Sequence, residues 1–170
     1  MNETVKNLVT RNSCRKYKNE HITRQELEEI LAAGLNAPSG RNLQTVRFVA
    51  VRDDATVDLL SGLNAAVMGT NADPFYGARD VVIVLAKKEG TYLYDGSLAM
   101  GNLLNASWSM GIDSCWIHRA KEVFESDRGR ELLARWGRTV DLEGIGCCIL
   151  GHAQESKPKV SINPDRVYFV

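Results

Sequence analysis

DGSLAMGNLLNASWSM, residues 95–110, is the stretch of sequence that decides the fold of this chain. Its apolar side chains do not share one face of a helix; they are Leu98, Met100, Leu103, Leu104, Ala106, Trp108 and Met110. A helix that is apolar nearly all round has to be buried on every side. A domain of this size can rarely surround a helix completely, so we expect part of it to form a subunit interface.

The composition indicates one soluble globular domain and excludes several classes of protein. The chain has 170 residues, 44% of them hydrophobic and 25% charged, which suits a single domain with its own core. Its 21 basic and 21 acidic residues cancel, which argues against a nucleic-acid partner, because phosphate binding needs a basic surface. The longest apolar run, residues 81–86, is too short to cross a membrane, and no signal peptide precedes it. We therefore expect a cytoplasmic protein without a membrane partner.

Hydrophobic periodicity predicts further helices and strands on both sides of the central helix. The expected helices lie around Val5, Leu8 and Val9, from the capping box of Thr23 and Glu26 to Gly34, through Val57, Leu60 and Leu63, and around Leu132, Leu133 and Trp136. The expected strands are residues 46–52, 80–86, 111–117 and 144–150, and residues 64–78 are expected to be irregular. This order is typical of an α+β fold with a mixed sheet between helical layers.

The last part of the chain, from about residue 153 to residue 170, is predicted to be an extended tail. It has no helical period, and the pattern Val167-Tyr-Phe-Val170 predicts one last short strand. Such a tail stays ordered only if something holds it, and in a dimer the natural anchor is the sheet of the partner. We therefore expect a single domain over residues 1–170 whose tail embraces a partner subunit.

Standard catalytic and metal-binding motifs do not occur in the sequence. Cys14, Cys115, Cys147 and Cys148 form no C-x-x-C pair, and the three histidines are too dispersed for a metal site. Buried, reduced cysteines are the main interpretation, and a vicinal redox pair at 147–148 is the alternative. Gly144-Ile-Gly146 precedes a strand rather than a helix, so it is no dinucleotide fingerprint. An enzyme without an evident acid, base or nucleophile indicates chemistry carried by an organic cofactor.

Three segments carry side chains suited to such a cofactor. In the basic segment, residues 11–15, Arg11 and Arg15 bracket Ser13, a pattern that suits a phosphate, although basic residues also stabilise helix C-termini. In the amide loop, residues 38–44, small residues accompany Asn42 and Gln44, whose amides match a flavin pyrimidine edge; an ordinary helix-to-strand connection is the alternative. The third segment is Lys157-Pro-Lys159, which could equally be a solvated tail.

Together these motifs resemble the FMN-dependent nitroreductase family. They are R-x-S-x-R-x-Y, A-P-S-G-x-N-x-Q, D-P-F-Y-G-A before the buried strand, D-G-S-L-A-M-G-N-L-L, and G-I-D-S-C-W-I-H-R-A-K-E, and they are typical of a compact bacterial branch. The resemblance runs from about Val5 to the C-terminus. It implies a mostly antiparallel sheet flanked by helices in an intertwined homodimer, with FMN in two interface pockets built from both subunits.

The resemblance also implies roles for individual residues. Arg11 and Ser13 would hold the FMN phosphate together with Lys159, and Arg15 would lie near the N1/O2 side of the ring. His118 and Arg119 would present backbone groups to the N5/O4 edge, and Asn71 would be the ring-binding asparagine, with Asn64 as its rival. From the partner, Ser39, Asn42 and Gln44 would approach the flavin.

The implied reaction is ping-pong: NADH or NADPH reduces the flavin, and an electron-poor acceptor such as a nitroaromatic compound or a quinone then reoxidises it. Asn12 and Asn163 stand where relatives often carry basic residues, which predicts a less cationic phosphate site. His118 stands where relatives are often smaller or acidic, and it is a candidate proton donor. The short chain has no room for a helical lid, which predicts an open pocket.

Three rival functions remain open. Reductive dehalogenation and flavin-consuming chemistry usually need additional lid residues, which the length of 170 residues disfavours. A flavin-binding redox sensor or flavin-storage dimer would bind the same cofactor without efficient turnover. A purely structural protein would bind no flavin at all.

Overall fold

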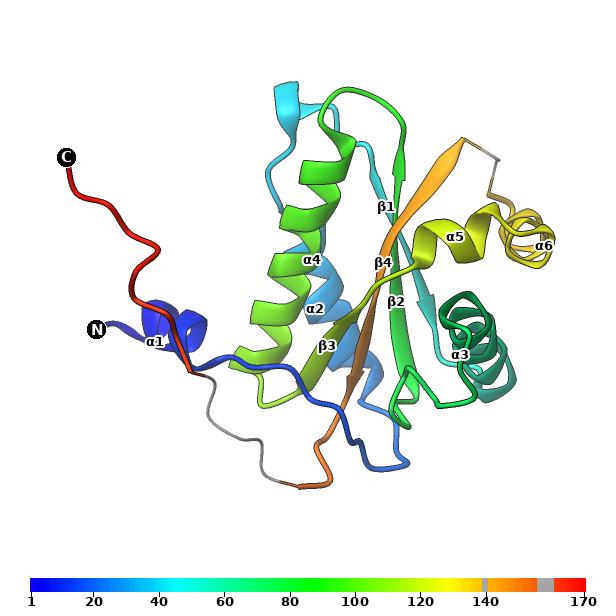
Figure 1. Ribbon diagram of the computed structural model, residues 1–170, viewed down its shortest axis with the longest axis horizontal. Helices are drawn as coiled ribbons and strands as arrows, with labels where there is room; N and C mark the ends of the chain where they lie inside the picture. The colour runs from blue at the N-terminus through cyan, green and yellow to red at the C-terminus, as the bar shows by residue number, and fades with distance from the viewer. Residues whose placement is uncertain (139–140, 156–160) are drawn as a thin grey trace.

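The computed structural model describes residues 1–138, 141–155 and 161–170. Its strands are β1 (Val46–Val51), β2 (Asp80–Lys87), β3 (Asp113–Ile117) and β4 (Leu142–Gly151). Its helices are α1 (Glu3–Thr10), α2 (Arg24–Leu35), α3 (Asp54–Met68), α4 (Tyr92–Ser109), α5 (Ala120–Glu125) and α6 (Asp127–Arg135), with a short 3-10 helix, η1 (Gly40–Asn42). The described strands form one sheet in the order β1-β2-β4-β3 (Figure 1).

Helices cover both faces of this sheet, as the sequence predicts. Side chains of the central strand β2 alternate between two cores, with Val81, Ile83 and Leu85 on one face. That face packs against α3, α5 and α6, whereas Val82, Val84 and Ala86 pack against α2 and α4 on the other (Figure 1). The α+β class and the helical layers are therefore confirmed.

Each strand pairing in the described part of the chain is antiparallel, which agrees with the mostly antiparallel sheet that the family resemblance implies, whereas the order of the elements predicts a mixed sheet. A helix between two strands usually gives a parallel crossover. Here, Val51 at the end of β1 pairs with Val81 at the start of β2. Residues 69–79 therefore bring the chain back to the end of the sheet at which β1 finished, and β2 runs in the opposite direction.

Side chains at the helix ends explain where several elements begin and stop. The predicted capping box opens α2, since the Glu26 N–H donates to Thr23 Oγ1 at 3.2 Å and the Thr23 N–H donates to Glu26 Oε2 at 2.7 Å. The Thr56 N–H donates to Asp53 at the start of α3, and Gly69 ends that helix with a φ of 67°.

Three parts of the fold differ from the sequence prediction. Helix α3 continues to Met68, through residues expected to be irregular, because the side chains of Asn64 and Ala65 are buried and extend the packed face of the helix by a further turn. Helix α5 was not expected, since six residues are too few to show a helical period. Residues 167–170 form no strand within the described chain and are exposed, so the predicted strand in a partner's sheet stays a prediction.

Helix α4 is only partly covered by its own chain. Ala99, Met100 and Leu103 are buried against the sheet and α2. On its other side, the side chains of Leu93, Tyr94 and Leu98 are 48%, 74% and 50% exposed. A single chain therefore leaves an apolar face of this helix in water, as expected for a subunit interface.

A buried carboxylate at the start of β2 joins three parts of the chain. Asp80 is fully buried, and it accepts hydrogen bonds from the Ile22 N–H at 2.8 Å and from Arg52 Nε at 2.7 Å. Arg52 Nη2 also donates to the Ile22 carbonyl at 2.5 Å. Asp80 thus fixes the segment before α2 to the ends of β1 and β2.

Asp80→Ala should lower the free energy of unfolding by about 3 kcal/mol, because it leaves a buried N–H and a guanidinium without their acceptor. Asp58→Ala is the matched control, since Asp58 pairs with Arg79 at the exposed surface and its removal should change stability by less than about 0.5 kcal/mol. Urea denaturation of both variants measures the difference. Equal losses would contradict this role for Asp80.

Candidate functional site

The basic segment lies between α1 and the sheet, beside β3. Arg11 caps the C-terminus of α1, with its N–H donating to the Asn7 carbonyl at 3.1 Å. The Cys14 N–H then donates to the Ser114 carbonyl of β3 at 3.0 Å, and Tyr17 forms a β-bridge with Ala153. These bonds hold the extended backbone of residues 11–17 in place, as the predicted phosphate ligands require.

Three predicted ligands of the basic segment act on the thiol of Cys115, which belongs to β3. Burial raises the pKa of Cys115, whereas a hydrogen bond from Ser13 and the positive charges of Arg15 and Arg11 oppose that rise. Arg11, Ser13 and Arg15 therefore lie on the part of the basic segment that neighbours Cys115 of β3. The structure therefore brings together the predicted ligands of the basic segment.

Arg11 carries an unused hydrogen-bond donor. Its Nη1 atom is buried but has no hydrogen-bond partner among the described residues. A buried donor without an acceptor is unfavourable unless a ligand supplies one. Two guanidinium groups and a hydroxyl around this point are the donor set that suits an oxyanion such as a phosphate.

The four cysteines are buried free thiols, which agrees with the main interpretation of the sequence. Cys147 and Cys148 belong to cores on opposite faces of the sheet, so they do not face each other. Burial raises the pKa of Cys147 to about 12, and it also raises the pKa of Cys148. Thiols of this kind stay protonated at neutral pH, which argues against the vicinal redox pair.

A buried asparagine supports the turn between β3 and α5. Asn64 of α3 is 1% exposed, and its Nδ2 donates to the His118 carbonyl at 2.7 Å. Arg119 follows with a left-handed φ of 72°, and no side chain caps the α5 helix that starts there. The His118 side chain is exposed, whereas Asn71 lies in an exposed bend after α3. Of the two candidate asparagines, Asn64 is therefore the one that contacts the turn of His118 and Arg119.

The amide loop has a strained but well-bonded backbone. Arg41, Asn42 and Gln44 have positive φ angles of 53°, 56° and 48°, each of which costs about 1 kcal/mol for a residue other than glycine. Hydrogen bonds within the loop hold this shape. The Gln44 N–H donates to Ser39 Oγ at 3.0 Å, and Gln44 Nε2 donates to Asn42 Oδ1 at 2.9 Å.

The amide loop and the basic segment lie in different parts of the chain. Figure 1 shows η1, drawn in cyan, beside the start of α4, whereas the blue segment after α1 lies near the opposite end of that helix. One chain therefore does not unite Ser39, Asn42 and Gln44 with Arg11, Ser13 and Arg15. The remaining predicted ligand, Lys159, lies outside the described residues.

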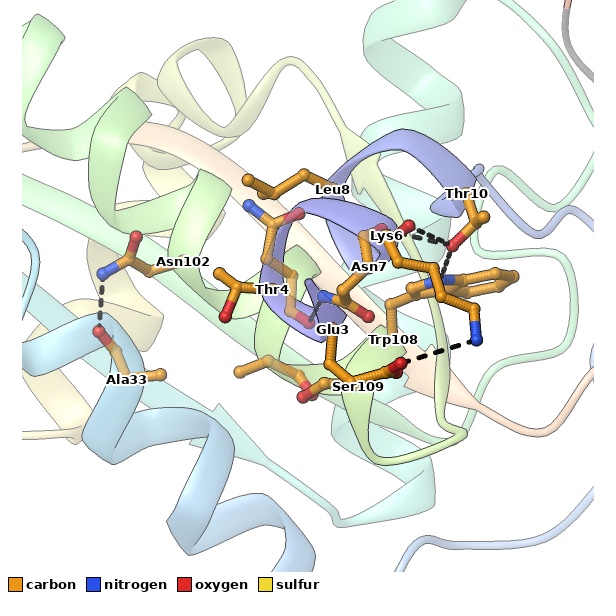
Figure 2. Close-up of a pocket in the computed structure, with 12 residues that line it drawn as sticks. Glu3, Thr4, Lys6, Asn7, Leu8, Thr10, Ala33, Asn102, Trp108 and Ser109 are labelled. Carbon is orange, nitrogen blue, oxygen red and sulfur yellow. Dashed lines mark hydrogen bonds and ion pairs between the residues drawn. The ribbon is translucent and has the colours of Figure 1, made fainter. Parts of the chain in front are cut away.

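A hollow of about 620 Å³ between α1, α2 and α4 was not foreseen from the sequence (Figure 2). Side chains that line it include Asn7, Leu8, Asn102, Ala106 and Trp108. Asn7 Nδ2 donates to the Asn105 carbonyl at 2.9 Å, and Trp108 Nε1 donates to Thr10 Oγ1 at 3.0 Å. Helix α1 thus rests on α4 through polar contacts and buries none of its own residues. The apolar residues of α4 were the sequence signal for this open side.

Neither metal ligation nor membrane insertion is indicated by the described residues. No group of three or more His, Cys, Asp and Glu side chains among them could hold a metal ion. No described helix combines the length and the hydropathy that spanning a membrane requires.

A family model described as "Nitroreductase family" matches residues 8–133. The chain belongs to the nitroreductase family. It is therefore an oxidoreductase by family, as the sequence motifs predicted.

Two nitroreductase crystal structures with bound FMN have the same fold. One, from Bacteroides fragilis, is 25% identical with a TM-score of 0.92, and the match covers 100% of both chains. The other, from Desulfitobacterium hafniense, is 27% identical with a TM-score of 0.90, and the match covers 100% of this chain and 99% of the Desulfitobacterium chain. A protein of Archaeoglobus fulgidus, provisionally named an NADH dehydrogenase/NAD(P)H nitroreductase, is 29% identical over 99% of this chain and 98% of its own length.

The contact between Asn64 and the β3–α5 turn can be tested with a matched pair of asparagines. Asn64→Ala should lower the free energy of unfolding by about 2 kcal/mol, because a buried hydrogen bond to the His118 carbonyl is lost. Asn71→Ala, at an exposed bend, should change it by less than about 0.5 kcal/mol. Amide hydrogen exchange in α5 should accelerate only in Asn64→Ala; acceleration in neither variant would rule out this support.

Proposed function

We propose that this nitroreductase-family chain is an FMN-dependent NAD(P)H oxidoreductase that reduces nitroaromatic compounds, quinones and similar electron-poor acceptors. The observation that carries the proposal is the buried, unpaired Nη1 of Arg11 beside Ser13 and Arg15. The two FMN-bound nitroreductases that share the fold over the whole chain support the identity of the ligand.

The residues of the basic segment fit the phosphate end of FMN. Arg11 and Ser13 would donate hydrogen bonds to the phosphate, with Lys159 as a further cation. Arg15 would lie near the N1/O2 side of the ring, where a fixed positive charge favours added negative charge. Bound FMN supplies the redox chemistry, in which electrons pass from NADH or NADPH to the acceptor in two separate half-reactions.

Residues around the ring would position it rather than react with it. Backbone groups of His118 and Arg119 would contact the N5/O4 edge, and the hydrogen bond from Asn64 to the His118 carbonyl would hold this turn in place. The family resemblance gives Asn71 a ring contact, which from its exposed bend would require the flavin to reach that surface. His118 is the candidate proton donor to the acceptor, and an unchanged pH profile of acceptor reduction in His118→Ala would exclude this role.

We further propose that the enzyme is a homodimer in which Ser39, Asn42 and Gln44 reach the partner's flavin. Large apolar side chains stay exposed on α1, on α4 and in the tail; they include Leu8, Val9, Leu93, Leu98, Tyr168 and Phe169. Exposed apolar surface of this extent is typical of a protein interface. The outer edge of β1 is unpaired in the described chain and offers a place for residues 167–170 of a partner.

Purified protein should be yellow, and NADH or NADPH should bleach its flavin absorbance under anaerobic conditions.

Arg11→Ala should weaken FMN binding by about 10-fold to 100-fold, because a charge-assisted hydrogen bond to the phosphate is lost. Arg128→Ala is the control, since Arg128 pairs with Glu131 on the exposed surface of α6. Stopped-flow mixing distinguishes the alternative: a flavin sensor or storage dimer would bind FMN but would not be bleached by either donor.

Replacing apolar tail residues should dissociate the dimer. The double variant Tyr168→Glu and Phe169→Glu should elute as a monomer and lose FMN, because burying two carboxylates in an apolar interface is unfavourable. Asp165→Ala with Arg166→Ala, in the same exposed tail, should remain dimeric. Size-exclusion chromatography with light scattering measures the mass. A wild-type monomer, or a dimer of the glutamate variant, would contradict the proposed role of the tail.

A further inference from the structure

A buried carboxylate joins the amide loop to the first turn of α4. Asp95 is 3% exposed, and its Oδ1 accepts hydrogen bonds from the Gly40 N–H at 3.0 Å and from Thr91 Oγ1 at 2.9 Å. Its Oδ2 atom is buried without a partner among the described residues. Both hydrogen bonds therefore go to one oxygen of this carboxylate, and the one from Gly40 holds the loop to α4.

The glycine at position 40 leaves room for the Thr91 hydroxyl that also bonds Asp95. A Cβ atom at Gly40 would lie 2.0 Å from Thr91 Oγ1, well inside van der Waals contact. The left-handed residues Arg41 and Asn42 follow directly, so the contact fixes the loop at the point where its strained part begins. Without this anchor, residues 41–44 would relax toward right-handed conformations, which are more stable for L-amino acids.

The anchored loop presents a defined pair of polar groups. Because Gln44 Nε2 donates to Asn42 Oδ1, the Nδ2 group of Asn42 and the Oε1 atom of Gln44 have no hydrogen-bond partner among the described residues. Both side chains are exposed. A donor beside an acceptor is complementary to the O=C–N–H edge of a pyrimidine-dione, the edge that a flavin ring carries.

We propose that Asp95 is a positioning residue for flavin binding, which holds the amide loop in the conformation that presents Asn42 and Gln44 to the ring. This inference rests on the proposed function. A ligand binds only the fraction of molecules whose loop has the competent shape, so its apparent affinity falls in proportion to that fraction. Asp95 raises this fraction without touching the ligand.

The ring and the phosphate of FMN can be tested separately, because riboflavin lacks the phosphate. In full-length protein freed of flavin, Asp95→Ala should weaken the binding of FMN and of riboflavin alike, by about tenfold or more. Arg11→Ala should weaken FMN binding and leave riboflavin binding within about threefold. Fluorescence titration measures both, and the visible bands of bound flavin should shift only in Asp95→Ala.

Further variants separate positioning from a general loss of structure. Asp95→Asn retains an oxygen that accepts from Gly40, so it should bind both flavins within about threefold of wild type. Gly40→Ala should reproduce the loss seen in Asp95→Ala, because its Cβ pushes the loop away from Thr91. Asp58→Ala, which removes a surface carboxylate, should change neither affinity. Circular dichroism should show that each variant is folded.

The outcomes distinguish this inference from the proposed function. If wild-type protein binds neither FMN nor riboflavin, both the proposed function and the role of Asp95 are wrong. If wild type binds both flavins and folded Asp95→Ala binds them equally well with unshifted bands, only the role of Asp95 is overturned. Weakened FMN binding with unchanged riboflavin binding would also overturn it, since the effect would then lie at the phosphate.

Discussion

The requirement to bury helix α4 is the constraint on which the rest of this structure depends. Its Met100 and Leu103 fill the core between the sheet and α2, and its first turn carries Asp95, which holds the amide loop. Its last turns carry the polar contacts on which α1 and then the basic segment rest. One helix therefore supports both groups of proposed ligands, which in the proposed dimer belong to two different flavin sites, and its exposed side indicates where a second chain would have to bind.

The two groups of proposed ligands beside this helix are held in different ways. The proposed phosphate ligands lie on extended chain that the hydrogen bond from the Cys14 N–H to the Ser114 carbonyl ties to β3, whereas the proposed ring-facing amides lie on a short loop with left-handed residues. Backbone bonds in a sheet tolerate most side-chain changes, but a strained loop depends on a few specific contacts. The backbone of the basic segment thus depends little on its own side chains, whereas the proposed ring-facing groups depend on buried polar side chains such as Asp95 and Asn64.

Much of the fold could be predicted from the sequence because its signals are local. The capping box of Thr23 and Glu26 and the apolar run of β2 specify their elements without help from other parts of the chain. The six residues of α5 and the strand directions depend on contacts between distant residues, which periodicity does not encode. In the site, residue types indicated Arg11 and Ser13, but the support from Asn64 and Asp95 became visible only once α3 and α4 were placed beside their partner loops.

Helix α1, which buries none of its residues, has a consequence for the enzyme in dilute solution. The basic segment continues directly from this helix, whose apolar side chains would be covered only in the proposed dimer. If each flavin is bound by the basic segment of one subunit and the amide loop of the other, dimer formation and FMN binding are thermodynamically linked. Specific activity would then depend on protein concentration and fall steeply below the dissociation constant of the dimer, and added FMN would shift that threshold to lower concentration by mass action.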